Sequence, residues 1–300
     1  MTASPAESGL NAPAESQAVW RSLLRSVTGS IEGRVGLAIL AAFLLVIALG
    51  PLLAPYGPTS IGVGGLDTGP STAHLLGTDD LGRDLLSRLL YGARSVALVP
   101  LLATVIAFAT GGIVGLLIGY VGGRVDAVVS RCIDVLLALP PILMVLVVLA
   151  AAGTSSLVIV LAAAVVYSPR VARVLRGATQ GVATQEYILS AQARGERALA
   201  IVLREVLPNI APTVFVEFAV RFTYVLIFVT TLNYLGLGAS PPSSNWGLLL
   251  ATAQNTIVTN PIASIAPALA IGALAVGVGL IADAATQSFG LEGAAELQAR

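Results

Sequence analysis

Few side chains in this sequence could do chemistry inside its long apolar stretches. Charged residues make up 11% of the 300 residues, and Glu217 and Arg221 are the two that lie well within an apolar run. Their spacing of four residues places them on one face of a helix, where they can form an ion pair. A charge in a membrane-spanning segment normally faces protein or a water-filled cavity. We expect the pair either to line a translocation path or to neutralise itself and stabilise a helix bundle.

A second charged group, at residues 77–94, alternates Asp with Arg. It predicts a short amphipathic helix on the membrane surface. Arg83, Asp84 and Arg88 are candidates for contact with another protein; the alternative is that they cap and orient the helix that follows. His74, in a Ser/Thr/Gly-rich stretch, is expected on a surface loop.

The third polar group is the segment 177–209, which we expect to face water. Its candidate functional residues are Glu186, Tyr187, Ala191, Gly195, Leu207 and Pro208. A short helix beginning at Glu186 could dock in a groove of a partner protein, Gly195 would let the chain turn out of that helix, and Pro208 would stop the segment that follows. The alternative is a solvated connector. The length of the segment argues against it, because a few residues would be enough to bridge two helices.

Composition disfavours enzymatic chemistry. With one histidine, one cysteine and no lysine, most acid/base and nucleophile pairs are excluded, as are His/Cys metal sites and a P-loop. The formal net charge of zero gives no indication of nucleic-acid binding. We therefore expect no catalytic, cofactor-binding or metal-binding residue in this chain, and we expect Cys132 to be a small buried hydrophobic residue.

The elements that must position these residues are membrane-spanning helices. Hydrophobic residues make up 56% of the chain, and about 20 consecutive apolar residues cross a bilayer. The uncharged run between Asp134 and Arg170 is too long for one crossing, so a break is expected at 152–156, with kinks at the prolines 140, 141 and 169. The fold class is an all-α polytopic membrane protein with six helices, at about 35–53, 95–123, 128–151, 156–176, 210–235 and 262–281.

Two further patterns concern helix packing and the outer surface. Gly111, Gly115 and Gly119 leave one helix face almost without side chains, which favours close helix contact; the alternative is that this face lines a substrate path. The uncharged connection 236–261, which contains Trp246, is typical of a partly re-entrant segment. If it has a function, we expect it to act as an outer gate.

Arginine positions predict the orientation. Lys/Arg concentrate on cytoplasmic segments, and with the N-terminus inside, twelve of the sixteen arginines are cytoplasmic: 21, 25, 34, 124, 131, 170, 173, 176, 194, 197, 204 and 300. Both termini and the segment 177–209 then face the cytoplasm. The domain organisation we expect is a partly disordered cytoplasmic tail at 1–32, a six-helix domain at 33–290 and a C-terminal tail at 291–300.

Four stretches of the sequence resemble the permease subunits of the dipeptide, oligopeptide and nickel branch of ABC importers. They occur in the family's order and on the expected membrane sides, although Leu189-Ser190-Ala191 stands where the family signature has Glu-Ala-Ala. The stretches are Ala54-Pro55-Tyr56; Gly77-Thr78-Asp79-Asp80-Leu81-Gly82-Arg83-Asp84 with Ser87-Arg88 and Tyr91-Gly92-Ala93-Arg94; Glu186-Tyr187, Ala191, Gly195 and Leu207-Pro208-Asn209; and Leu235-Gly236-Leu237-Gly238, Pro241-Pro242 and Asn245-Trp246-Gly247.

The resemblance implies a type I ABC importer permease fold in the bacterial inner membrane. It also implies that the helix beginning at Glu186 is a coupling helix that docks on an ATPase. The implied partners are a second homologous permease, two ATPase subunits or one fused ATPase that bind ATP and Mg, an extracytoplasmic solute-binding protein, and membrane lipid. Peptides are the expected cargo, with nickel, glutathione, opines or haem as alternatives.

Two functions of other classes compete with an importer subunit. An ion-coupled secondary transporter often has inverted repeats and discontinuous helices around a midplane site. The sequence has no such internal symmetry, and Glu217 is its single acidic residue deep in a span. A membrane-embedded enzyme is disfavoured because no catalytic constellation is present.

Overall fold

The computed structural model describes residues 24–298, with side chains to residue 287. Most of the predicted N-terminal tail therefore lies outside the described residues. The described part is helical, apart from loops and one isolated bridge between Thr78 and Asp84. The helices are α2 (Ile31–Leu53), α3 (Leu85–Val121), α4 (Gly123–Ala138), α5 (Pro141–Ala152), α6 (Ser156–Ala183), α7 (Glu186–Ala193), α8 (Ala198–Ile201), a π-helical turn (Val202–Val206), α9 (Leu207–Tyr234), α10 (Trp246–Thr252), a 3₁₀ turn (Ala253–Thr256) and α11 (Ile262–Gln298).

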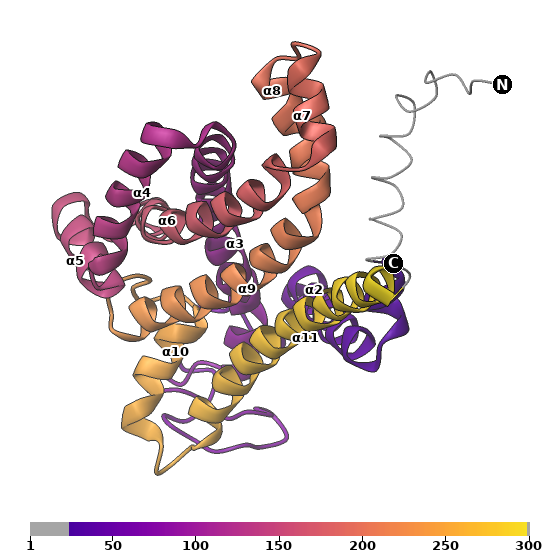
Figure 1. Cartoon of the computed structure of the whole chain (residues 1–300). Helices are drawn as coiled ribbons and strands as arrows, with labels where there is room; N and C mark the ends of the chain where they lie inside the picture. The colour runs from indigo at the N-terminus through magenta and orange to yellow at the C-terminus, as the bar shows by residue number, and fades with distance from the viewer. Residues whose placement is uncertain (1–23, 299–300) are drawn as a thin grey trace.

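Five of the described helical segments are long and apolar enough to cross a membrane, and α4 with α5 makes a sixth if the bent pair is one span. The all-α, six-span prediction is thus confirmed as five to six spans. Buried side chains form two main clusters. One lies among α3, α5, α6 and α9, and the other among α2, α3, α9, α10 and α11. The shared helices α3 and α9 join the two halves of the bundle (Figure 1).

Helices α3 and α6 pack closely because one face of α3 lacks side chains. A Cβ added at Gly111 would lie 2.1 Å from the Ser168 carbonyl oxygen, and one at Gly115 would lie 2.5 Å from the Ala172 carbonyl oxygen. Such approaches need glycine. The packing interpretation of the glycine row is confirmed, since this face lies against α6.

The helix predicted over 128–151 is two helices that meet at 85°. A residue before proline avoids the α region, and both Leu139 (ψ 134°) and Pro140 (ψ 125°) are extended. Pro141 then begins α5, a position at which its missing N–H is not needed. Two adjacent prolines therefore produce a full break where a kink was expected.

The segment predicted as a cytoplasmic loop is almost entirely helical. Helix α6 continues to Ala183, and α8 leads through the π-helical turn directly into α9. Pro208 does not stop this segment, so that expectation is wrong. A proline removes one backbone donor and clashes with the carbonyl four residues earlier. Here the turn before Pro208 is widened to a π form, in which the Leu207 N–H donates to the Val202 carbonyl.

The two groups of connecting segments lie at opposite ends of the bundle. The loop 54–84 and α10 lie at the lower end of Figure 1, whereas α7 and α8 project from the upper end. In α10, Trp246 is 2% exposed, donates its Nε1–H to the Leu89 carbonyl at 2.8 Å and packs edge-on against Phe43. The indole thus fixes the uncharged connection to α2 and α3.

Candidate functional sites

Asp79 is the centre of a buried ion network in the loop 54–84, which we call the outer loop. Its Oδ1 accepts the backbone N–H groups of Leu81 and Arg83, both at 2.9 Å, and its Oδ2 accepts the Arg83 Nε–H at 2.7 Å. Arg88 Nη1 also donates to Oδ2, and Arg88 Nη2 donates to the Ser243 carbonyl at 2.8 Å. One carboxylate therefore holds two buried guanidinium groups and, through Arg88, the chain just before α10.

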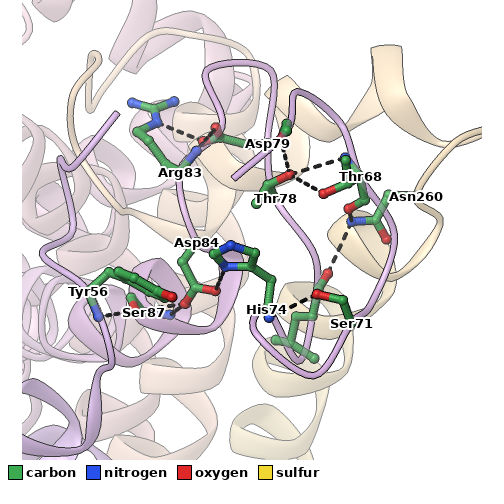
Figure 2. Close-up of polar contacts among 12 residues, drawn as sticks. Tyr56, Thr68, Ser71, His74, Thr78, Asp79, Arg83, Asp84, Ser87 and Asn260 are labelled. Carbon is green, nitrogen blue, oxygen red and sulfur yellow. Dashed lines mark hydrogen bonds and ion pairs between the residues drawn. The ribbon is translucent and has the colours of Figure 1, made fainter. Parts of the chain in front are cut away.

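Asp84 is the N-cap residue of α3 and also contacts the histidine of the outer loop. Its Oδ2 accepts the Ser87 N–H at 2.8 Å and the Ser87 hydroxyl at 2.7 Å, which is an N-cap. Its Oδ1 lies 3.0 Å from Nδ1 of His74 (Figure 2). His74 is 7% exposed and packs against Tyr56 with ring centroids 5.2 Å apart. The prediction of a surface position for His74 is therefore wrong.

The charged residues predicted to contact a binding protein are buried and form their contacts within this chain. Arg83, Asp84 and Arg88 are 3%, 2% and 1% exposed. The expected separate amphipathic helix at 77–94 is also not present: 77–84 is loop, and α3 starts at Leu85 because Asp84 caps it. The structure thus gives these three residues the alternative role of capping and orienting the second span.

Asn260 fastens the outer loop to the start of α11, and sequence reasoning missed it. Its side chain is fully buried, and its Nδ2 donates to the carbonyls of Thr68 at 3.2 Å and Leu76 at 3.0 Å (Figure 2). The available signal was a polar asparagine directly before Pro261 in an uncharged connection. Its partners, more than 180 residues away, gave no such signal.

Helix α7 packs on the bundle with one face. Ile188 and Ala191 are fully buried in a cluster with Ile201, Val206 and Ile210. Gln192 Nε2 donates to the Tyr120 hydroxyl at 3.2 Å. The prediction that residues 188, 191 and 192 share one side of a helix is confirmed, and that side faces the cytoplasmic ends predicted for α3, α6 and α9.

Gly195 ends α7 in a Schellman motif. Its φ is +76°, its N–H donates to the Gln192 carbonyl at 2.9 Å, and the Glu196 N–H donates to the Ala191 carbonyl at 3.3 Å. The predicted turn at Gly195 is confirmed. The opposite face of α7 is solvent-facing: Glu186 is exposed, and Tyr187 and Leu189 are 41% and 52% exposed. Leu207 and Pro208, half-buried, begin α9 beside this cluster.

Glu217 and Arg221 form the predicted pair within α9. They are 9% and 8% exposed, and Arg221 donates both its Nε–H, at 3.0 Å, and its Nη2–H to Glu217 Oε1. The Arg221 guanidinium carbon lies 5.9 Å from the ring centroids of both Tyr167, on α6, and Tyr224. The pair is therefore buried between α6 and α9, and its neighbour Tyr224 is 57% exposed.

A polar cavity of about 320 Å³ lies between α4 and α6, lined by Ala127, Ser130, Arg131, Ile133, Asp134, Arg173 and Arg176. Two ion pairs join α4 and α6 here, Arg173 with Asp134 and Arg176 with Asp126. Cys132 of α4 is exposed, so the expectation of a buried cysteine is wrong. Within the described residues no group of three His, Cys, Asp or Glu side chains is arranged to hold a metal ion.

Comparison with known proteins gives one consistent family. Residues 111–290 match the family model described as binding-protein-dependent transport system inner membrane component. The dipeptide transport system permease protein DppC of Alkalihalophilus pseudofirmus is 31% identical over 264 residues, covering 88% of this chain and 87% of the relative. The glutathione transport system permease protein GsiD of Pectobacterium atrosepticum is 35% identical, with the same coverage of both chains.

A solved structure agrees in fold. A chain of the MetNI methionine ABC transporter, in an inward-facing conformation, superposes with a TM-score of 0.52 at 15% identity, covering 66% of this chain and 96% of that one. Together with the apolar spans, these matches identify a multi-pass protein of the bacterial inner membrane. The chain belongs to the family of binding-protein-dependent transport system inner membrane components, the permease subunits of ABC importers.

Proposed function

We propose that this chain is one of two permease subunits of an ATP-driven peptide importer, and that α7 is the segment that docks on the ATPase. The observation that carries the docking role is that α7 is buried on one side and exposed on the other. Ile188 and Ala191 are fully buried, whereas Leu189 between them is 52% exposed. A short helix that is fixed on one side and apolar on the other matches the helix-in-groove mode of recognition.

The connection from α7 to the translocation path is short and stiff. After the Gly195 turn, α8, the π-helical turn and α9 run without a non-helical residue from Ala198 to Tyr234. Movement of α7 would therefore be transmitted to α9, and so to Glu217 and Arg221. In this proposal the ATPase subunits, separate or fused, bind ATP and Mg, and ATP-driven closure of the ATPases switches the two permeases between inward-open and outward-open states.

The path would lie where Glu217 and Arg221 approach the surface, facing the second permease. Dipeptides and glutathione, named for two of the relatives, make short peptides the cargo we propose. On the outer side, the solute-binding protein would meet exposed apolar side chains of the outer loop, such as Ile61, Leu66 and Leu75, because Arg83, Asp84 and Arg88 are buried.

Affinity purification of the tagged chain from its native host, in mild detergent, tests this function. We expect a second permease and ATPase subunits to co-purify, and reconstituted vesicles to import a labelled dipeptide only with ATP and a binding protein. A chain that purifies alone and imports on an ion gradient without ATP would contradict the proposal and favour a secondary transporter. Import of nickel or haem, with peptides excluded, would contradict the cargo alone.

A further inference from the structure

A second arginine lies beside the Glu217–Arg221 pair. Arg170 of α6 has its guanidinium carbon 5.5 Å from the centroid of the Tyr167 ring, and Arg221 of α9 lies 5.9 Å from the same ring. Tyr167 is 7% exposed and also packs edge-on against Phe228. The Tyr167 ring thus contacts two cations from different spans. We call this group the arginine cluster; its members are Tyr167, Arg170, Glu217, Arg221 and Tyr224.

The arginine cluster carries an excess positive charge. Among the described residues, Glu217 is the carboxylate that pairs within it, and both of its contacts come from Arg221. Arg170 forms no ion pair with a described carboxylate; its Nη1 donates to the Val166 carbonyl of its own helix at 3.1 Å. The cluster therefore holds two guanidinium groups and one carboxylate, and that carboxylate is engaged by Arg221 alone.

The excess charge is accessible from one side. Arg170 is half-buried, whereas Tyr224, in contact with Arg221, is 57% exposed. Most of the Arg170 donors are unused within the described residues, and a guanidinium presents paired N–H groups that match a carboxylate. A negatively charged group from outside the subunit can therefore reach the unused donors of Arg170 and balance the excess positive charge.

Building on the proposed function, we infer that the arginine cluster is a binding station for a carboxylate of the passing peptide, with Arg170 as its principal donor. Dipeptides and glutathione, the named cargoes of the two relatives, both carry free carboxylates. The competing source of negative charge is a carboxylate of the second permease, and the experiment below separates the two.

The test uses the complete complex in vesicles, with its binding protein unchanged, and two peptides of one sequence, one with a free C-terminal carboxylate and one with a C-terminal amide. Each variant's rate is divided by the wild-type rate for the same peptide, so that preferences of the binding protein cancel. We expect Arg170→Gln to lower import of the free acid on the order of tenfold, the size of one charge-assisted hydrogen bond, and to leave the amide within about twofold. Arg170→Lys should restore part of the loss.

Arg173→Gln is the matched control, since Arg173 lies one turn further along α6 and pairs with Asp134 at the exposed edge of the α4–α6 cavity. It should affect both peptides equally and weakly. Equal loss of both peptides in Arg170→Gln, no loss of either, or separation of the variant from the second permease during purification would each overturn the inference. Wild-type import of neither peptide would instead refute the peptide-importer function itself.

Discussion

The two ends of this subunit use the residues of their sequence motifs in opposite ways. In the outer loop the charged motif residues are buried and paired with one another or with the backbone: Arg83, Asp84 and Arg88 are at most 3% exposed. At the α7 end the charged residues lie in solvent, as in the exposed Arg194–Glu196 pair, and α7 is held by a small apolar cluster. The motif residues of the outer loop therefore stabilise the loop itself, whereas α7 presents an exposed face that a partner could bind.

Removing the centre of the outer network should have the largest effect. Asp79→Ala removes the carboxylate partner of buried Arg88 and the closer of the two carboxylates beside Arg83, which costs about 3–5 kcal/mol. We expect a strongly lowered unfolding temperature in detergent and poor yield. Asp80→Ala is the control, because the Asp80 side chain is 51% exposed and lies 3.6 Å from Arg83; exposed pairs contribute at most about 1 kcal/mol. Equal effects of the two changes would contradict a structural role for the buried network.

Overfilling the inner face of α7 should have the next largest effect. Ala191→Leu places a larger side chain where the native residue is fully buried, at a cost of about 1–3 kcal/mol. We expect faster hydrogen exchange confined to α7 and its neighbours. Ala193→Leu, on the exposed face, should leave exchange unchanged. Similar exchange in both variants would mean that α7 is not anchored through Ala191.

A smaller, purely backbone effect is expected at the turn after α7. A Cβ on Gly195 would meet nothing within 4 Å, but its φ is +76°, which costs other residues about 1–2 kcal/mol. Gly195→Ala should therefore increase proteolysis at 194–196 without lowering the global unfolding temperature. Gly195→Asn should be milder, since Asn tolerates this conformation. If the Ala and Asn variants resist protease as well as the wild type does, the turn does not depend on the glycine.

The smallest effect is expected at Asp67, which lies near Asp79 and Asp80 in the outer loop. Burial first, and then the charges of Asp80 and Asp79, raise the pKa of Asp67 above its ordinary value. A raised pKa in the folded state means that ionised Asp67 lowers stability at neutral pH and that protonation removes this cost. Asp67→Asn, which also suits the φ of +50°, should raise the unfolding temperature slightly at neutral pH. The part of this gain due to charge should disappear as the pH falls through the raised pKa towards the ordinary carboxyl range, and a wholly pH-independent gain would contradict the electrostatic cause.

The sequence located the spans because each needs a long uncharged run, and it predicted the Glu217–Arg221 pair and the Gly195 turn because both depend on residues close in the chain. It did not predict contacts between distant residues. His74 meets Asp84 ten residues later, and Asn260 meets Thr68 across most of the chain. Likewise, the size of the break at Pro140 and the π-helical turn before Pro208 depend on how neighbouring helices pack.

The contrast between the two ends is tested most directly by ATP hydrolysis of the purified complex, measured with and without the loaded binding protein. Leu189 of α7 and Leu203 of the π-helical turn are both 52% exposed, so Leu189→Arg and Leu203→Arg are matched changes. We predict that Leu189→Arg abolishes stimulation by the binding protein or releases the ATPase subunits, whereas Leu203→Arg retains both. Full stimulation in Leu189→Arg, with the ATPase still bound, would contradict α7 as the coupling surface.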